Sequence, residues 1–339
     1  MKNKNQFVSI SVWIFFLILA GVWVYTAKLK PTRQSGVSVF SGNVPVANQV
    51  ANQVAQKTVA PIAGLEESVT PSVGVVLPAT WGDLGLKLVN AGVIDEAKFK
   101  AIYEQRGTFS NENKNLLLGT NNGKLKITKE NSGYLLNLLW ALGLSNKNDI
   151  LDTGEMVNKS YGGAGNFAST GGWTISKGKA MDHYSKYKFL TLTAAQQALV
   201  DKISRGIFRP CCGNSTHFPD CNHGMAMLGL LELMASQGAS EQAMWNAALT
   251  VNSYWFPDTY LTIATFMNNT GVEWKDVNPM EMLGSNYSSS KGYARIAAQT
   301  PMPQQAGASS GGGCGIDTGS SAASAPTAAP VQQQSGCGL

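Results

Sequence analysis

One short stretch of the chain holds most of the residues that can bind a metal or react as nucleophiles. Between Pro210 and Met227 lie three of the five cysteines and two of the three histidines, namely Cys211, Cys212, Cys221, His217 and His223. Thiolate and imidazole are the ligands that soft and borderline transition metals prefer. The pattern Cys-Cys-x8-Cys-x-His therefore predicts a transition-metal site, with copper or zinc favoured over iron.

Within this stretch, Cys212, Cys221 and His223 are the strongest candidate ligands. Cys-x-His keeps two donors close together, and the turn-rich segment 213–220 can bring the third donor back to them. Cys211 competes with Cys212, because the side chains of adjacent residues usually diverge. His217 is a further candidate ligand.

Three other residues near the cluster have a simpler interpretation. His183 is expected to be a structural or surface histidine. Met225 and Met227 can supply thioethers to Cu(I), but methionine on an apolar helix is ordinary core packing. We expect none of the three to be a ligand.

Other chemistries compete with metal binding. A disulfide between Cys212 and Cys221 would leave Cys211 as a thiol. A thiol oxidoreductase, or a metal-assisted hydrolase with Asp220 or Glu232 as base, is an enzymatic alternative. The sequence shows no phosphate loop, dinucleotide fingerprint or Cys-x-x-Cys-His haem motif.

The elements that position the cluster are predicted to be two helices. A capping box at Thr193 begins an amphipathic helix that runs to Ile207, directly before Pro210. After the cluster, a strongly apolar helix runs to Ser236 and ends at Gly238. Cys221 then lies at a helix N-terminus, where backbone N–H groups and the helix dipole favour the thiolate.

The rest of the folded part is also predicted to be mainly α, as a single helical globular domain over 78–300 with long loops. Residues 152–179 are rich in glycine, serine and threonine and indicate a long loop anchored by Trp173. The alternation from Asn121 to Ile127 indicates a hairpin. Further helix starts are predicted at Thr80, Asp95, Thr128, Ser240, Pro257 and Pro279.

The two ends of the chain have different compositions. After a basic N-terminus (1–6), Phe7–Ala27 carries no charge over about 21 residues, enough to cross a hydrocarbon core as a helix. We expect a single-pass membrane anchor rather than a cleaved signal peptide, then a flexible linker (28–77). The tail 301–339, with Cys314 and Cys337 between glycines, is expected to be disordered.

These two cysteines also suggest an alternative function. If they form crosslinks between chains, the protein is a structural surface protein in which the cluster is a disulfide staple.

Charge and composition limit the partners. The net charge of +5 is modest, and no basic stripe points to nucleic acid. A hydrophobic content of 44% is enough for a sizeable core. The expected partners are the membrane, through the N-terminal helix, and a protein that exchanges metal with the cluster.

The cluster resembles the bacterial exported proteins with a PCYCGC motif. The similarity rests on Pro210-Cys211-Cys212-Gly213, then on Asp220-Cys221-x-His223, and on an apolar helix that ends in the step Gly238-x-Ser240, all within 208–252. The chain differs from that family in its adjacent cysteines, its single Cys221 and the lack of a lipobox. The resemblance implies an exported, membrane-associated, metal-binding protein.

Overall fold

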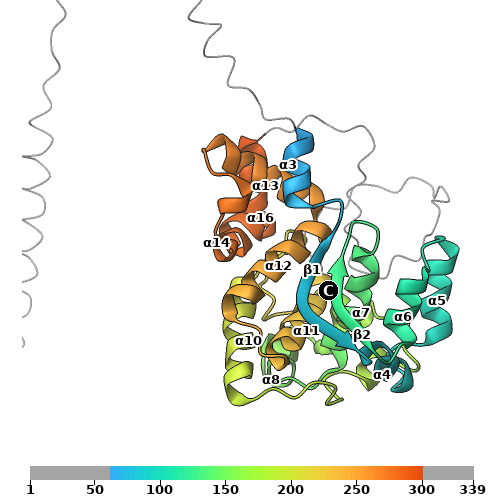
Figure 1. Cartoon of the computed structure of the whole chain (residues 1–339). Coiled ribbons are helices and arrows are strands. Elements are labelled where there is room, and N and C mark those ends of the chain that lie inside the picture. The colour runs from blue at the N-terminus through green and yellow to red at the C-terminus, as the bar shows by residue number, and fades with distance from the viewer. Residues whose placement is uncertain (1–61, 301–339) are drawn as a thin grey trace, which may run out of the picture. The chain divides into compact units, whose positions relative to one another are not determined.

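The computed structural model describes residues 62–300, which are mainly helical with one small two-stranded sheet (Figure 1). The strands are β1 (Val75–Gly82) and β2 (Asn122–Ile127). The helices are α3 (Ile62–Val69), α4 (Leu84–Asn90), α5 (Glu96–Gln105), α6 (Asn111–Leu118), α7 (Ser132–Ser145), α8 (Asp149–Thr153), α9 (Ala168–Gly171), α10 (Ala194–Gly206), α11 (Asn222–Ser236), α12 (Glu241–Trp255), α13 (Pro257–Asn269), α14 (Pro279–Leu283), α15 (Ser285–Ser288) and α16 (Ser290–Gln299).

Helices α7 and α11 pack against each other at the centre of the fold. Both are apolar on all sides, and both are buried over almost their whole length, as expected for helices with neighbours on every face. A side chain at Gly143 would collide with the carbonyl oxygen of Met225, and one at Gly229 with that of Leu139. The two glycines therefore let the backbones of α7 and α11 touch.

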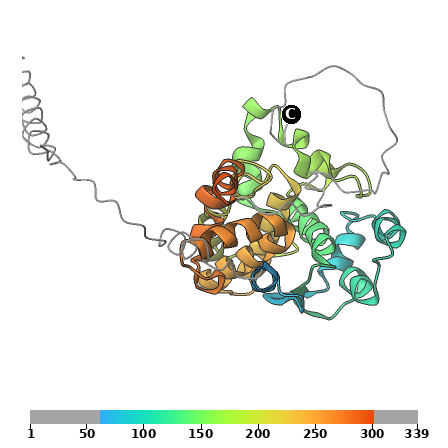
Figure 2. The ribbon, with the colours of Figure 1, turned by 90° about the horizontal axis from the view of Figure 1, so that it is seen from above.

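The other helices surround this pair. In both views α4–α6 lie on one side of the molecule and α12–α16 on the other (Figures 1 and 2). The predicted capping box at Thr193 is confirmed: its side chain accepts from the N–H of Gln196, and the Gln196 side chain accepts from the N–H of Thr193. Ser240 caps α12 as predicted. Sequence signals thus placed the starts of α10, which leads into the cysteine loop, and of α12.

The sheet differs from the hairpin that the sequence predicted. β2 pairs in the antiparallel sense with β1, so Val75 lies opposite Ile127 and Gly82 opposite Asn122. Thr80 lies in β1 and does not begin a helix; α4 starts after Asp83 instead. The alternating burial of β1, which places Leu77, Ala79 and Trp81 in the core, explains why a strand forms there.

The predicted long loop at 152–179 contains only short helical turns, including α9. Trp173 anchors it, as predicted: the indole is buried and its Nε1–H donates to the carbonyl of Val93 at 2.8 Å. The ring also packs edge-on against Trp140 of α7. The loop is therefore fixed to the central core.

The structure places α3 and the start of β1 within the segment 28–77, before residue 78, where the predicted helical domain begins. α3 packs against α13, so tertiary contact rather than local sequence accounts for it. Within 62–300, no helix has both the length and the apolar character needed to cross a membrane. The predicted anchor at 7–27 and the predicted disordered tail at 301–339 lie outside the described residues.

Candidate metal centre

The three cysteines lie where a loop meets the start of α11. After α10 ends, Phe208 forms a bridge with Ser215, which closes the loop into a short hairpin-like turn. The N–H of His217 donates to the carbonyl of Ser204 at 3.1 Å, and the N–H of Ser290 donates to the carbonyl of Cys212 at 3.0 Å. Backbone hydrogen bonds to α10 and α16 therefore hold both sides of the loop.

Cys221 is the N-cap residue of α11, in agreement with the prediction. Its backbone is extended, and its Sγ accepts a hydrogen bond from the N–H of Gly224 at 3.4 Å. The side chain is fully buried. A sulfur atom in this position receives both a backbone donor and the positive end of a 15-residue helix.

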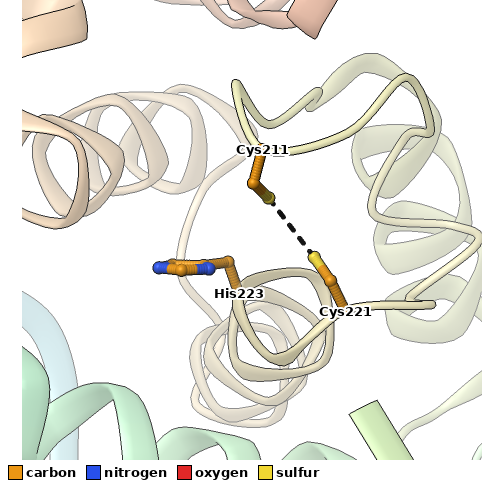
Figure 3. Close-up of side chains that lie close together, drawn as sticks. All are labelled: Cys211, Cys221 and His223. Atoms are coloured by element: carbon orange, nitrogen blue, oxygen red, sulfur yellow. Dashed lines mark hydrogen bonds between the residues drawn. The ribbon is translucent and has the colours of Figure 1, made fainter. Parts of the chain in front are cut away.

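The structure brings Cys211, Cys221 and His223 together (Figure 3). The Sγ atoms of Cys211 and Cys221 point toward each other and are 3.5 Å apart. One ring nitrogen of His223 lies within 4.8 Å of both sulfurs. A second group shares Cys221 and adds Cys212 and Asp220, again with donor atoms within 4.8 Å of one another.

His223 lies in a buried, aromatic environment. Its ring is buried against Phe256, with the ring centres 4.4 Å apart, and Trp255 packs edge-on beside it. Among residues 62–300, nothing forms a hydrogen bond with its Nδ1. A buried ring nitrogen without a partner is costly, and a metal ion bound to it would remove that cost.

Arg209 lies fully buried beneath the cluster. Its Nη2 donates to Oδ1 of Asp220 at 2.6 Å and to the carbonyl of Phe218 at 3.3 Å. Its Nε and Nη1 have no hydrogen-bond partner in the described part of the chain. The guanidinium packs so closely on Gly224 that a Cβ there would approach its Cζ to 2.7 Å. A side chain at this position in the first turn of α11 would therefore displace the guanidinium.

The buried groups shift one another's ionisation. Burial opposes the charge on Arg209, but the adjacent Cys221, Cys212 and Asp220 outweigh it and raise the arginine pKa. Thiol hydrogens from Cys211 and Cys212, followed by the charge of Arg209, hold the pKa of Cys221 well below its usual range. The pKa of Cys211 is raised, because it donates within the thiol cluster. The stable arrangement is a Cys221 thiolate that accepts from neighbouring thiols.

Asp220 belongs to the same network but is already engaged. Burial raises the pKa of its carboxyl group, although Arg209 opposes this. Its Oδ2 accepts from Nδ2 of Asn214 at 2.7 Å, while Oδ1 accepts from Arg209. The carboxylate therefore orients the arginine and the loop, which makes it a weaker candidate ligand than the sulfurs.

His217 does not join the cysteines, although the sequence placed it among the candidate ligands. Its Nδ1 lies 2.7 Å from the carboxylate of Glu155, and its Nε2 lies 2.9 Å from that of Asp201. Both ring nitrogens are thus occupied by carboxylates on opposite sides. His217 lines a separate cleft of about 720 Å³, beside the N-terminal half of α10, and no cysteine lines that cleft.

The residues expected to be structural have that role. His183 contacts the Tyr187 hydroxyl at 2.8 Å and the carbonyl of Lys177 at 2.7 Å through its two ring nitrogens. Met225 and Met227 are fully buried in the core on α11. Arg209 was not among the residues predicted to belong to the site. The sequence signal for it is a positively charged residue directly before Pro210 and the cysteine pair.

Compared with known proteins, the chain matches no family model, no curated sequence and no solved structure. The resemblance to PCYCGC-motif proteins stays a prediction. The sulfur and nitrogen donors of the cluster can hold a transition metal, and its paired thiols can undergo oxidation.

Proposed function

We propose that this protein is a membrane-anchored, extracytoplasmic binder of copper or zinc that stores the ion or passes it to a partner. The ligands are Cys211, Cys221 and His223, with Cys212 as an additional sulfur donor. The observation that carries the proposal is the convergence of donor atoms from Cys211, Cys221 and His223 within 4.8 Å of one another.

The chemistry of the donor set favours copper or zinc over harder metals. Two or three sulfurs with one imidazole suit tetrahedral zinc, and thiolates also select Cu(I). The Cys221 thiolate is already favoured before metal arrives, so less proton release accompanies binding at this sulfur. Arg209 offsets part of the negative charge that several thiolates would place in the interior.

The burial of the ligands supports transfer through one side of the site. Cys221 and His223 are buried on α11, whereas Cys211 is only half-buried on the loop. An ion entering or leaving would therefore contact Cys211 first. A partner protein with its own thiolate could take over the ion at this point by ligand exchange.

The proposed location rests on two features of the amino-acid sequence. The apolar segment 7–27 supplies the anchor, and the resemblance of 208–252 to exported proteins supports an extracytoplasmic domain. Fractionation of cells followed by protease treatment of intact cells tests this: digestion of the domain from outside is expected. Protection of the domain in intact cells, with cleavage only after lysis, would place it on the cytoplasmic side.

Metal binding itself is tested on the full-length chain purified under reducing conditions. Elemental analysis after dialysis against limiting zinc or Cu(I) is expected to give about one ion per chain. Cys221→Ser removes the sulfur that both ligand groups share and is expected to lower the affinity by at least about 100-fold. His223→Ala is expected to weaken binding less, because the sulfurs stay.

Two tail substitutions provide the matched control. Cys314→Ser and Cys337→Ser remove thiols that the proposal does not use, so the double variant should bind as the wild type does. Circular dichroism of each variant shows whether it folds. A folded wild-type protein that retains no ion, or a folded Cys221→Ser variant that retains it fully, would refute the proposal.

A further inference from the structure

We propose that the same site is a peroxide-oxidised dithiol switch, in which a reversible disulfide between Cys211 and Cys221 expels the bound ion. This assigns the reactive pair to Cys211 and Cys221, not to Cys212 and Cys221. The loss of metal rests on the proposed function; the formation of the disulfide does not.

The distance between the sulfurs supports this pairing. The Sγ atoms of Cys211 and Cys221 are 3.5 Å apart and point toward each other (Figure 3). A disulfide needs a separation of about 2.05 Å, so the sulfurs must approach by roughly 1.5 Å. Cys211 belongs to a loop without helix or strand, so this approach does not require α11 to move.

Cys212 is a poorer partner although it lies nearby. Its Sγ also lies within 4.8 Å of the Cys221 sulfur, but it has a second acceptor in Oδ1 of Asp220, with sulfur and oxygen 3.9 Å apart, and its carbonyl oxygen is held by the N–H of Ser290. It is also buried, whereas Cys211 is half-buried. The more accessible sulfur is therefore also the one that faces Cys221.

The surroundings of Cys221 stabilise a negative charge on its sulfur. The N–H of Gly224 donates to Sγ, and the N-terminus of α11 lies directly beneath it. Arg209 contributes a buried positive charge whose Nε and Nη1 have no hydrogen-bond partner in residues 62–300. Two uncommitted donors beside a thiolate also suit an oxygen atom added to sulfur, since they can bind it as it forms.

The oxidant that fits is hydrogen peroxide or another small hydroperoxide, because Cys221 is fully buried and bulky disulfides would reach it slowly. The Cys221 thiolate attacks one peroxide oxygen, the O–O bond breaks, and hydroxide leaves, which gives a sulfenic acid. The Cys211 sulfur then attacks the Cys221 sulfur. The S–O bond breaks, and the sulfenic oxygen leaves as water with the Cys211 proton. Two electrons pass from the two sulfurs to the peroxide.

Oxidation would remove two of the three ligands that converge on the site. A disulfide sulfur is a weak ligand compared with a thiolate, so His223 and Cys212 would be left to hold the ion. The expected result is release of the metal to solvent or to a partner. A dithiol reductant restores both thiolates and the site.

The test uses the full-length chain with Cys314→Ser and Cys337→Ser, so that the cluster holds the remaining cysteines. The reduced, metal-free protein receives one equivalent of hydrogen peroxide and is then analysed by intact mass and peptide mapping. The expected product has lost two hydrogen atoms and carries a Cys211–Cys221 crosslink. Addition of Cys212→Ser should leave this product unchanged.

A second variant reports the intermediate. With both Cys211→Ser and Cys212→Ser, no resolving thiol is present, and the protein is expected to gain one oxygen that a sulfenic-acid reagent labels at Cys221. A crosslink mainly to Cys212, a Cys211–Cys212 crosslink, or unreacted wild-type thiols would each overturn the proposed pair.

An experiment on metal-loaded protein distinguishes the proposed metal-binding function from the proposed disulfide switch. Metal-loaded protein treated with peroxide is expected to lose its ion in step with disulfide formation, and to rebind it after reduction. A reduced protein that never binds metal but forms the Cys211–Cys221 disulfide would refute the proposed function alone. A protein that binds metal and keeps it while the disulfide forms would refute the switch.

Discussion

Arg209 and Glu232 are two fully buried ionisable residues, one beside the N-terminus of α11 and one in its C-terminal half, and they differ in how their polar atoms are satisfied. Glu232 accepts from Nδ2 of Asn146 at 2.6 Å and from Nδ2 of Asn148 at 2.8 Å, so both of its oxygens are used. Arg209 uses only Nη2, and its Nε and Nη1 have no partner within 62–300.

This contrast separates a complete hydrogen-bond network from an incomplete one. Asn146 lies at the end of α7, and both amides lie before α8, so the hydrogen bonds to Glu232 join secondary-structure elements and are complete. In contrast, Nε and Nη1 of Arg209 have no hydrogen-bond partner within 62–300, at the place where three thiols converge. A native interior rarely leaves buried donors unpaired, so the unused donors point to an anionic species at the cysteines, either thiolates that bind a metal or an oxidised sulfur.

The largest effect is expected from Arg209→Met. The substitution leaves Asp220 buried without its cation, and breaking a buried ion pair in this way costs about 3–5 kcal/mol of unfolding free energy. It should also slow peroxide oxidation of Cys221, because the thiolate loses a neighbouring positive charge. Urea unfolding and the rate of thiol loss measure the two effects.

Arg205→Met is the matched control, because Arg205 pairs with Asp201 at the surface, where its side chain is 55% exposed. A surface pair contributes at most about 1 kcal/mol. Equal losses of stability in the two variants would contradict the special status of Arg209. In the Arg209→Met background, Asp220→Asn should recover part of the stability by removing the unpaired charge.

An intermediate effect is expected from Glu232→Gln. Burial raises the pKa of Glu232 from 4.5 to about 8, despite the two amide donors. Between these values the folded protein holds a proton that the unfolded chain has released, so the unfolding free energy of the wild type falls as the pH rises. The variant lacks this dependence and should gain about 4 kcal/mol relative to the wild type between pH 4.5 and pH 9.

Unfolding curves measured at several pH values test this, with Glu104→Gln, a substitution at an exposed glutamate, as the matched control. Glu232 lies eleven residues beyond Cys221, or about 16 Å along the helix. Metal content and peroxide reactivity should therefore not change in Glu232→Gln. A loss of metal in a folded variant would mean that the two ends of α11 are coupled, contrary to the comparison.

The smallest effect is expected from His217→Gln. The ring joins Glu155 and Asp201, whose side chains are 40% and 42% exposed, so solvent weakens these pairs and the loss should be about 1 kcal/mol. Metal binding should stay at the wild-type level, because His217 does not lie with the cysteines. Elemental analysis of the variant decides this, and a large loss of metal would restore His217 as a ligand.

The sequence predicted the helical class and the helices on each side of the cluster because their signals are local. The capping box at Thr193, the cap at Ser240 and the apolar run after Cys221 each lie within a few residues of the feature they specify. Ligand candidates Cys211, Cys212, Cys221 and His223 are likewise close in sequence. For these residues the spacing alone was informative.

Features that depend on distant contacts were not predicted. β2 pairs with β1, and the paired residues Val75 and Ile127 are more than forty positions apart in the sequence. Nothing near Asn122 specifies β1 as the partner strand. His217 was assigned to the cluster by its position in the chain, but Glu155 and Asp201 hold it elsewhere. The burial of Arg209 depends on Asp220 and Gly224, which the fold brings beneath the loop.

The close contact of α7 and α11 at Gly143 and Gly229 has a consequence for the thermodynamics of the site. Since the two backbones touch, α11 cannot slide along α7, and Cys221 and His223 are held in place before any ion arrives. The entropy lost on binding is then confined to the loop that carries Cys211. Changes in the length or stiffness of 213–219 would tune affinity and exchange rate while the helix-borne half of the site stays the same.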